Sequence, residues 1–205
     1  MRFDTFIFFS LILIFNSCNP VPESNSIKNI NSLNFNTLTL KNNNNNYTAV
    51  IEIPAGTNKK YEYNYSTNSF ECEVIDNKPR TIKYLPYPGN YGFIPGTYMT
   101  PSKGGDGDAL DVLILSESKS QGSVLEIKPI AILKLHDQGE EDHKIIAMDL
   151  NDDNRFITDS LTTPIKNIIQ TWFCNYKGPN KMEFIAWGNQ FEAIEEIKKW
   201  DKNSF

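Results

Sequence analysis

Polar and apolar residues alternate along much of the chain between residues 47 and 149, a pattern typical of half-buried β-strands. Turn-forming sequences such as Pro54-Ala55-Gly56 and Ser66-Thr67-Asn68 separate the alternating segments. Pro129 lies inside the longest segment and predicts an edge or a bend there. The pattern predicts strands over Tyr47–Ile53, Lys60–Tyr65, Phe70–Ile75, Val112–Leu115, Val124–Leu135 and Lys144–Asp149.

Helical spacing of large apolar residues appears only late in the chain. It occurs in Pro164–Tyr176 and again in Gln190–Trp200, where Ile, Phe and Trp recur every three or four positions. Neighbouring strands followed by two helices predict a mainly β (α+β) fold, in which the helices flank a small closed β-barrel. We expect Trp172, Trp187 and Trp200 in its core.

The N-terminus has a different pattern. Residues 6–15 form an apolar run that is far shorter than the about 20 residues of a membrane-spanning helix and suits the core of a signal peptide. The run leads to Cys18 in a sequence similar to a bacterial lipobox, although Phe15 and Asn16 depart from that motif. The alternative is a plain secretory signal with an incidental cysteine. We expect a signal peptide over residues 1–18 and a lipid-anchored protein outside the cytoplasm, in the bacterial cell envelope.

Residues 19–46 are rich in Asn and Ser and poor in charge. Such a sequence buries too little apolar surface to offset the entropy of ordering it. We therefore expect a flexible tether over residues 19–46 and a folded domain over residues 47–205. The apolar positions around Phe35 and Leu38 are compatible with one strand or one patch that docks on the domain.

Composition limits the class of protein further. A chain of 205 residues with 40% hydrophobic residues can fill the core of one domain of ordinary size. A formal net charge of -5 provides no basic surface for nucleic acid, which we do not expect as a partner. Once Cys18 is assigned to the anchor, Cys72 and Cys174 could pair outside the cytoplasm, but two buried thiols are the expected state.

Three carboxylates fall within six positions at Asp106, Asp108 and Asp111, between glycines and a run of strand-forming residues. Carboxylates this close repel one another unless a cation lies between them, so the segment indicates a divalent-metal site. A helix-loop-helix calcium loop is excluded because Asp111 stands where its sharp turn requires glycine. A phosphate-binding glycine loop is excluded because no Lys-Ser or Lys-Thr pair follows, and a solvated acidic turn remains the alternative.

A second acidic segment, from Asp137 to Asp142, lies between two predicted antiparallel strands and is followed by Lys144. Alone it would be a solvated hairpin tip. His136 and His143 flank it, but Mg²⁺ prefers oxygen ligands and histidines at hairpin ends usually face solvent. Both histidines are therefore expected outside the site.

Taken together, these segments resemble the family I soluble inorganic pyrophosphatases, from about Tyr47 to Trp200. Each matching element is weak alone, but six in the same order over most of the chain are highly specific. The resemblance implies an OB-like β-barrel with flanking helices, in agreement with the order of the predicted elements. The matching elements are Ile51-Glu52-Ile53-Pro54, Lys60-Tyr61-Glu62, Asn90-Tyr91-Gly92-Phe93, Asp106-Gly107-Asp108-Ala109-Leu110-Asp111, the segment from Asp137 to Lys144, and Tyr176-Lys177.

The resemblance implies hydrolysis of inorganic pyrophosphate, with several Mg²⁺ ions per site and with Mn²⁺ or other divalent ions as alternatives. It assigns the general base, which deprotonates the attacking water, to Asp108. It assigns metal binding to Asp106, Asp111, Asp137 and Asp142, and phosphate binding to Lys60, Arg80, Tyr91, Lys144, Tyr176 and Lys177. Close support is assigned to Glu52, Glu62, Tyr87 and Glu140. A homo-oligomer is expected as well.

These residue types suit the chemistry. Pyrophosphate is a polyanion that repels hydroxide, so its hydrolysis requires charge neutralisation, a lowered pKa of the attacking water and a stabilised leaving phosphate. Carboxylates are the ligands that Mg²⁺ prefers, while Lys, Arg and Tyr stabilise phosphate oxygens by charge and hydrogen bonds.

Two departures from the family pattern and two other functions remain open. Ala109 stands where the family usually has proline or glutamate, which puts the rigidity of that turn in doubt. The spacing from Arg80 to Tyr87 differs by one residue from that in some members, so Lys78 or Lys83 could take the role of Arg80. The other functions are a catalytically inactive, divalent-cation-binding envelope protein on the same fold and a phosphohydrolase for a larger phosphoanhydride. A mere cation binder would need neither a general base nor phosphate-binding side chains.

Overall fold

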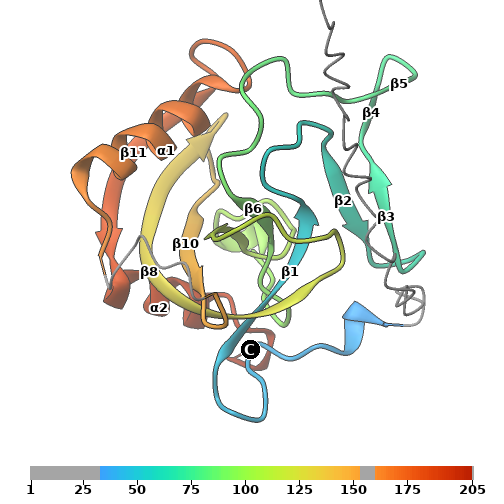
Figure 1. Ribbon diagram of the computed structural model, residues 1–205, viewed down its shortest axis with the longest axis vertical. Coiled ribbons are helices and arrows are strands. Elements are labelled where there is room, and N and C mark those ends of the chain that lie inside the picture. The colour runs from blue at the N-terminus through green and yellow to red at the C-terminus, as the bar shows by residue number, and fades with distance from the viewer. Residues whose placement is uncertain (1–32, 153–159, 205) are drawn as a thin grey trace, which may run out of the picture. The chain divides into compact units, whose positions relative to one another are not determined.

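The computed structural model describes residues 33–152 and 160–204 of the chain (Figure 1). The expected signal peptide, its Cys18 and the first part of the expected tether lie outside the described residues. Within the described ranges, no helix is long and apolar enough to cross a membrane.

Five strands form a ring that is seen nearly end-on in Figure 1. The ring closes because β1 pairs with β6 on one side and with β8 on the other. Neighbouring strands are antiparallel except for β7 and β10, which run parallel. This arrangement confirms the predicted mainly β (α+β) fold built on a small barrel. In ring order the strands are β1 (Tyr47–Ile53), β6 (Asn90–Phe93), β7 (Asp111–Leu115), β10 (Lys144–Asp149) and β8 (Val124–Asp137).

The longest strand, β8, extends beyond the ring. Its start pairs with β1 and its middle with β10, while its end pairs with β11 (Met182–Asn189) and with the short β9 (Glu140–Glu141). The register of β8 against β10 shifts beside Pro129, so that Ala131 faces Ile146 but Pro129 faces Ala147. A bulge at a strand proline produces a bend of the kind that the sequence predicted.

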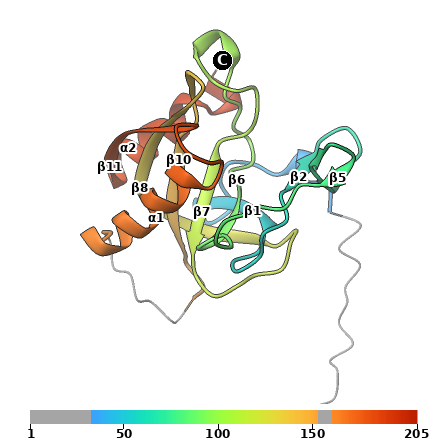
Figure 2. The same cartoon turned by 90° about the horizontal axis from the view of Figure 1, so that it is seen from above.

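Two small hairpins lie beside the ring and form sheets of their own (Figures 1 and 2). The first joins β2 (Tyr61–Asn64) to β3 (Ser69–Cys72), and the second joins β4 (Val74–Ile75) to β5 (Lys78–Pro79). Neither sheet shares a ladder of backbone hydrogen bonds with the barrel. Side-chain packing and a few loop contacts therefore decide where these hairpins lie.

Both helices lie near the part of the sheet where β11 pairs with β8, as Figure 2 shows. Helix α1 (Thr163–Asn175) buries Ile169, Trp172 and Phe173, and helix α2 (Gln190–Lys199) buries Ala193 and Ile197. Short 3-10 helices occur at Phe35–Thr37, Pro101–Lys103 and Lys202–Ser204.

Alternate residues of a strand serve different cores. Leu113 on β7 belongs to a cluster with residues of α1, whereas its neighbours Val112 and Ile114 belong to a cluster with residues of α2. Two faces of one strand can be buried in this way because successive side chains point to opposite sides.

Residues 33–46, which the sequence analysis included in the tether, lie against the folded domain. Phe35 is 4% exposed and belongs to a third apolar cluster with Val50, Tyr63 and Phe93. Lys41 bridges to Tyr47, where β1 begins.

The main differences from the sequence predictions concern β6, β11 and the cysteines. The strands β6 and β11 were not predicted, whereas both predicted helices are present within one residue of their expected ends. Trp172 and Trp200 are buried and Trp187 is half-buried. Cys72 and Cys174 are free, as expected, but they are half-buried and not fully enclosed.

Candidate active site

A cleft of about 280 Å³ brings together side chains from all parts of the domain. Among the predicted site residues that the structure describes, Tyr87 is not part of its lining; the predicted lipidation site, Cys18, lies outside the described residues. Five further lining residues were not predicted: Tyr63, Tyr65, Glu73, Phe93 and Ala109. The predicted residues that do line the cleft are Glu52, Lys60, Glu62, Arg80, Tyr91, Asp106, Asp108, Asp111, Asp137, Glu140, Asp142, Lys144, Tyr176 and Lys177.

The acidic loop before β7 is held in a bent conformation. Gly107 has a φ of +90°, which L-residues with a side chain rarely adopt. The side chain of Asp106 accepts a hydrogen bond from the backbone N–H of Asp108 at 2.9 Å. The N–H of Met99 donates to the Asp108 carbonyl at 2.7 Å, which ties the loop to the preceding segment. The bend places Asp106, Asp108 and Asp111 around one cleft although Asp111 has the opposite strand parity.

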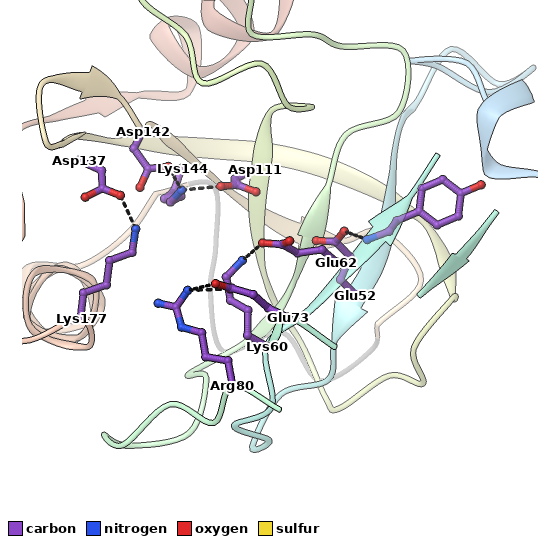
Figure 3. Close-up of polar contacts among 11 residues, drawn as sticks. Glu52, Lys60, Glu62, Glu73, Arg80, Asp111, Asp137, Asp142, Lys144 and Lys177 are labelled. Carbon is purple, nitrogen blue, oxygen red and sulfur yellow. Dashed lines mark hydrogen bonds and ion pairs between the residues drawn. The ribbon is translucent and has the colours of Figure 1, made fainter. Parts of the chain in front are cut away.

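Lys144 lies between two of the carboxylates (Figure 3). It faces Asp111 across the parallel strands β7 and β10, and its Nζ lies 2.5 Å from Asp111 Oδ2. It also contacts Asp142, two residues earlier on the same side of the chain. Burial lowers the pKa of Lys144, but the charges of Asp111 and Asp142 outweigh it and hold the pKa well above its usual value. Burial likewise raises the pKa of Asp142, and Lys144 reverses this and lowers it.

The second acidic segment faces the same cleft. Asp137, at the end of β8, pairs through Oδ2 with Lys177 Nζ at 2.5 Å. Its other oxygen, Oδ1, is buried and has no hydrogen-bond partner among the described residues. A buried acceptor without a donor costs free energy unless a water or a cation satisfies it.

Lys60 and Arg80 enter the cleft from the hairpins. Lys60 Nζ lies 2.5 Å from Glu62 Oε1, and Arg80 Nη1 contacts both carboxylate oxygens of Glu73, at 2.9 and 2.7 Å. Backbone bonds fix the second pair, since the Arg80 N–H donates to the Glu73 carbonyl at 2.7 Å. Lys78 and Lys83 are exposed and do not line the cleft, so Arg80 is the base that occupies this position. Glu73 carries no local sequence signal, because only the folded hairpin brings it to Arg80.

Three tyrosines lie near the bases. Tyr91 and Tyr176 line the cleft, while Tyr87 packs behind them, 5.1 Å from the Tyr91 ring and 4.6 Å from Trp172 between ring centroids. Burial raises the pKa of Tyr87 to about 12 and holds that of Tyr91 well above its usual value, so both hydroxyls stay protonated and can donate hydrogen bonds.

Glu52 forms part of the cleft wall on β1. Its Oε1 accepts a hydrogen bond from the Tyr63 N–H at 2.7 Å, which links the barrel to the β2–β3 hairpin. Burial raises the pKa of Glu52 to about 8, against the opposing effect of this hydrogen bond.

The sequence matches the family model of the inorganic pyrophosphatases over residues 49–204. The chain belongs to the inorganic pyrophosphatase family. Inorganic pyrophosphatases of Saccharolobus solfataricus and Neisseria meningitidis serogroup B are 37% identical over 158 residues and 35% identical over 169 residues. These matches cover 73% and 76% of this chain and 86% and 89% of the relatives. Crystallised inorganic pyrophosphatase from Thermus thermophilus has a similar fold, with a TM-score of 0.71 and 27% identity over 83% of this chain and 98% of that one.

The charges of the pyrophosphatase cleft are unbalanced. Nine carboxyl groups line it against four basic side chains. Burial raises the pKa of Asp106 to about 6, and burial together with Asp111 raises that of Asp108. Clustered carboxylates with raised pKa values, together with the partnerless Asp137 Oδ1, form an oxygen donor set that fits divalent cations. The residues present therefore agree with the divalent-metal dependence of this family.

A second group of possible ligands lies outside the cleft lining of this pyrophosphatase. Glu141, His143 and Glu196 approach one another, but His143 Nδ1 already contacts Glu196 Oε1 at 3.2 Å. Glu141 Oε2 accepts from Lys199 Nζ at 2.5 Å. His143 is 8% exposed, so the expectation that it faces solvent is wrong: successive residues alternate sides, and Glu196 of α2 covers the side opposite to Asp142 and Lys144. The group is therefore joined by a hydrogen bond between His143 and Glu196 and by ion pairs of Lys199 with Glu141 and Glu196.

Proposed function

We propose that this chain hydrolyses inorganic pyrophosphate to two phosphates with Mg²⁺. The observation that carries the proposal is the arrangement of the cleft, in which metal-binding carboxylates and phosphate-binding bases face each other within about 280 Å³. Membership of the inorganic pyrophosphatase family supports the same substrate.

The metal ligands in this proposal are Asp106, Asp111 and Asp142, with Asp137 at a further ion. Mg²⁺ is proposed because all the side chains offer oxygen and because Mg²⁺ shares its coordination sphere with substrate phosphates. When bound, it supplies charge neutralisation and lowers the pKa of the attacking water. Lys144 pairs with Asp111 and Asp142 and lowers the pKa of Asp142, and the free Oδ1 of Asp137 points to a ligand that its own protein partners do not provide.

Asp108 is the proposed general base. Among the described residues its carboxylate has no ion-pair partner, unlike Asp111, which contacts Lys144. Burial raises its pKa, and a carboxylate with a raised pKa is a better proton acceptor. In the proposed reaction it takes one proton from the water whose oxygen bonds to phosphorus, while the bridging P–O bond breaks.

The basic side chains then stabilise the departing phosphate. Lys60, Arg80 and Lys177 are partly exposed in the cleft and can exchange their present carboxylate partners for phosphate oxygens. Tyr91 and Tyr176 add neutral hydroxyl donors. Glu52, Glu62, Tyr87 and Glu140 support the positions of these groups.

The two other functions are less well supported. An inactive cation binder would not need the four bases that line the cleft. The nine carboxyl groups and four bases that line the cleft suit a polyanion bound together with cations, and the competing substrate in the assay below tests a larger phosphoanhydride such as a nucleotide.

One assay tests the reaction and the choice of base. Phosphate release from pyrophosphate with Mg²⁺ is measured for the parent chain and for Asp108→Asn, with a nucleoside triphosphate as the competing substrate. Asn keeps the size of Asp but cannot take the proton, so we expect kcat to fall at least about 100-fold. No release by the parent would contradict the enzyme, equal release by both would contradict the base, and faster release from the triphosphate would contradict the substrate.

We further propose that the chain is a lipoprotein of the bacterial cell envelope, anchored at Cys18, and that it forms a homo-oligomer. The support for the anchor is the short apolar run before Cys18 and the Asn-rich segment after it. Cys18→Ala should abolish incorporation of labelled fatty acid, and continued labelling would refute the anchor. Light scattering of the purified protein tests the oligomer, and a monomer mass at working concentration would refute it.

A further inference from the structure

Phe35 lies fourteen residues before the start of the family match at residue 49. Its ring makes edge-on contacts with Tyr63 and Phe70, at centroid distances of 5.2 and 5.4 Å. The next residue, Asn36, donates through its side chain to the Tyr65 carbonyl at 3.0 Å, and its side-chain oxygen lies 3.3 Å from the Tyr63 hydroxyl, which makes its shorter contact with the side-chain oxygen of Asn68. The segment thus contacts the β2–β3 hairpin by both packing and hydrogen bonds, and Figures 1 and 2 both place it beside β2.

The hairpin that Phe35 contacts forms one wall of the cleft. Tyr63 and Tyr65 line the cleft, and Lys60 and Glu62 extend from the same chain segment. Tyr63 also connects the hairpin to the barrel, because its N–H donates to Glu52 and its ring stacks on Phe93 at 5.8 Å. Since β2 and β3 share no ladder with the barrel, this aromatic cluster largely determines where the wall lies.

The same cluster reaches the acidic loop. Ala109, between Asp108 and Asp111, packs against the cluster of Phe35, Val50, Tyr63 and Phe93. A residue that precedes the start of the family-model match therefore packs in one cluster with both the hairpin and the acidic loop.

We propose that Phe35 is a positioning residue of the active site, and that the segment before residue 49 is therefore needed for normal substrate binding. Phe35 holds the β2–β3 hairpin in the position in which Lys60 meets the substrate. The inference rests on the proposed pyrophosphatase function.

The expected kinetic effect is specific. If loss of the Phe35 ring lets the hairpin leave its position, only a fraction of molecules can bind substrate, and the apparent dissociation constant rises by the inverse of that fraction. Molecules that do bind still carry Asp108 and the metal ligands. We expect Phe35→Ala in the full chain to raise KM for pyrophosphate at least about fivefold with kcat within about twofold of the parent, and Phe35→Leu to restore most of the loss.

Two controls separate positioning from general destabilisation. Leu33→Ala changes an exposed residue of the same segment and should leave KM unchanged. Ile197→Ala removes a fully buried side chain of α2 in a different cluster and should lower the melting temperature without raising KM. An unchanged KM in Phe35→Ala, or an equal rise in Ile197→Ala, would overturn the proposal.

Amide hydrogen exchange tests the positioning without any assay of activity. In Phe35→Ala the Tyr63 amide should exchange at least about tenfold faster, while amides of β8 and β10 keep the rates of the parent. Unchanged exchange at Tyr63 would overturn the positioning role even in an active enzyme. If the parent chain releases no phosphate but the Tyr63 amide exchanges faster in Phe35→Ala, the proposed function is rejected. The role of Phe35 in holding the β2–β3 hairpin is then still supported. If Phe35→Ala fails to fold, the same two measurements on Phe35→Val decide, because Val removes the ring and fills less of its space than Leu; an unchanged KM and unchanged exchange at Tyr63 in Phe35→Val would overturn the proposal.

Discussion

Two carboxyl groups of the cleft are buried to a similar extent, but their pKa values shift in opposite directions. Glu52 is 8% exposed and Asp142 is 9% exposed. The pKa of Glu52 rises to about 8 because desolvation outweighs the single hydrogen bond from Tyr63, whereas Lys144 overcomes the same penalty at Asp142 and lowers its pKa. The neighbouring charge, and not the depth of burial, therefore decides which carboxyl group is ionised.

Glu52→Gln should stabilise the metal-free protein at alkaline pH. An ordinary glutamate titrates near 4.5, so between pH 4.5 and about 8 the folded state holds a proton that the unfolded state has released. Stability falls as pH rises through this window, and Gln removes that loss while it can still accept the Tyr63 N–H. A shift of one pKa unit corresponds to about 1.36 kcal/mol, and screening of the charge reduces this value. We therefore expect Glu52→Gln to increase the free energy of unfolding by about 2 kcal/mol more at pH 8.5 than at pH 4.

Urea unfolding in EDTA at the two pH values measures this gain. Glu183→Gln, at an exposed position of β11, serves as the control. A similar pH dependence in both variants would show that Glu52 has no special role.

At the scale of elements, local signals and long-range contacts were not equally visible in the sequence. The strands β1 and β10 were predicted with their observed ends, because alternation or an apolar run marks them. The strand β6 was missed because Asn90-Tyr91-Gly92-Phe93 has the composition of a turn. Its Gly92 is required by a distant residue, since a Cβ there would lie 1.8 Å from the Val50 carbonyl oxygen on β1. The pair Arg80–Glu73 depends on a folded hairpin in the same way.

The N-terminus of α2 should contribute measurably to stability. The Asn189 side chain accepts from the Glu192 N–H at 3.1 Å, and the Asn189 N–H donates to Glu192 Oε2 at 3.0 Å, which together form a capping box. We expect Asn189→Ala to cost about 1 kcal/mol and to lower the melting temperature by about 3 °C, because unpaired N–H groups remain at the helix end.

The helix lies away from the cleft residues, so kcat and KM should stay at the values of the parent. Asn189→Asp keeps an acceptor at the cap and should retain the parent's melting temperature. If it melts as low as Asn189→Ala, the cap is not the source of the effect.

At the scale of the whole molecule, one cleft gathers nine carboxyl groups against four bases. Without cations these carboxylates repel each other in the folded state and are relieved in the unfolded chain, whose groups lie farther apart. Divalent ions that bind only the folded state should therefore stabilise it strongly. At 100 times the dissociation constant the gain is about 2.7 kcal/mol, which corresponds to a rise of about 5 to 10 °C in melting temperature for a chain of this length.

Calorimetry with EDTA and then with Mg²⁺ measures the rise. Asp106→Asn should reduce it, and NaCl at equal ionic strength should give only a small part of it, because screening does not replace coordination. An equal rise in NaCl would mean that the acidic loops are merely screened surface charge and would remove the physical basis for a metal site.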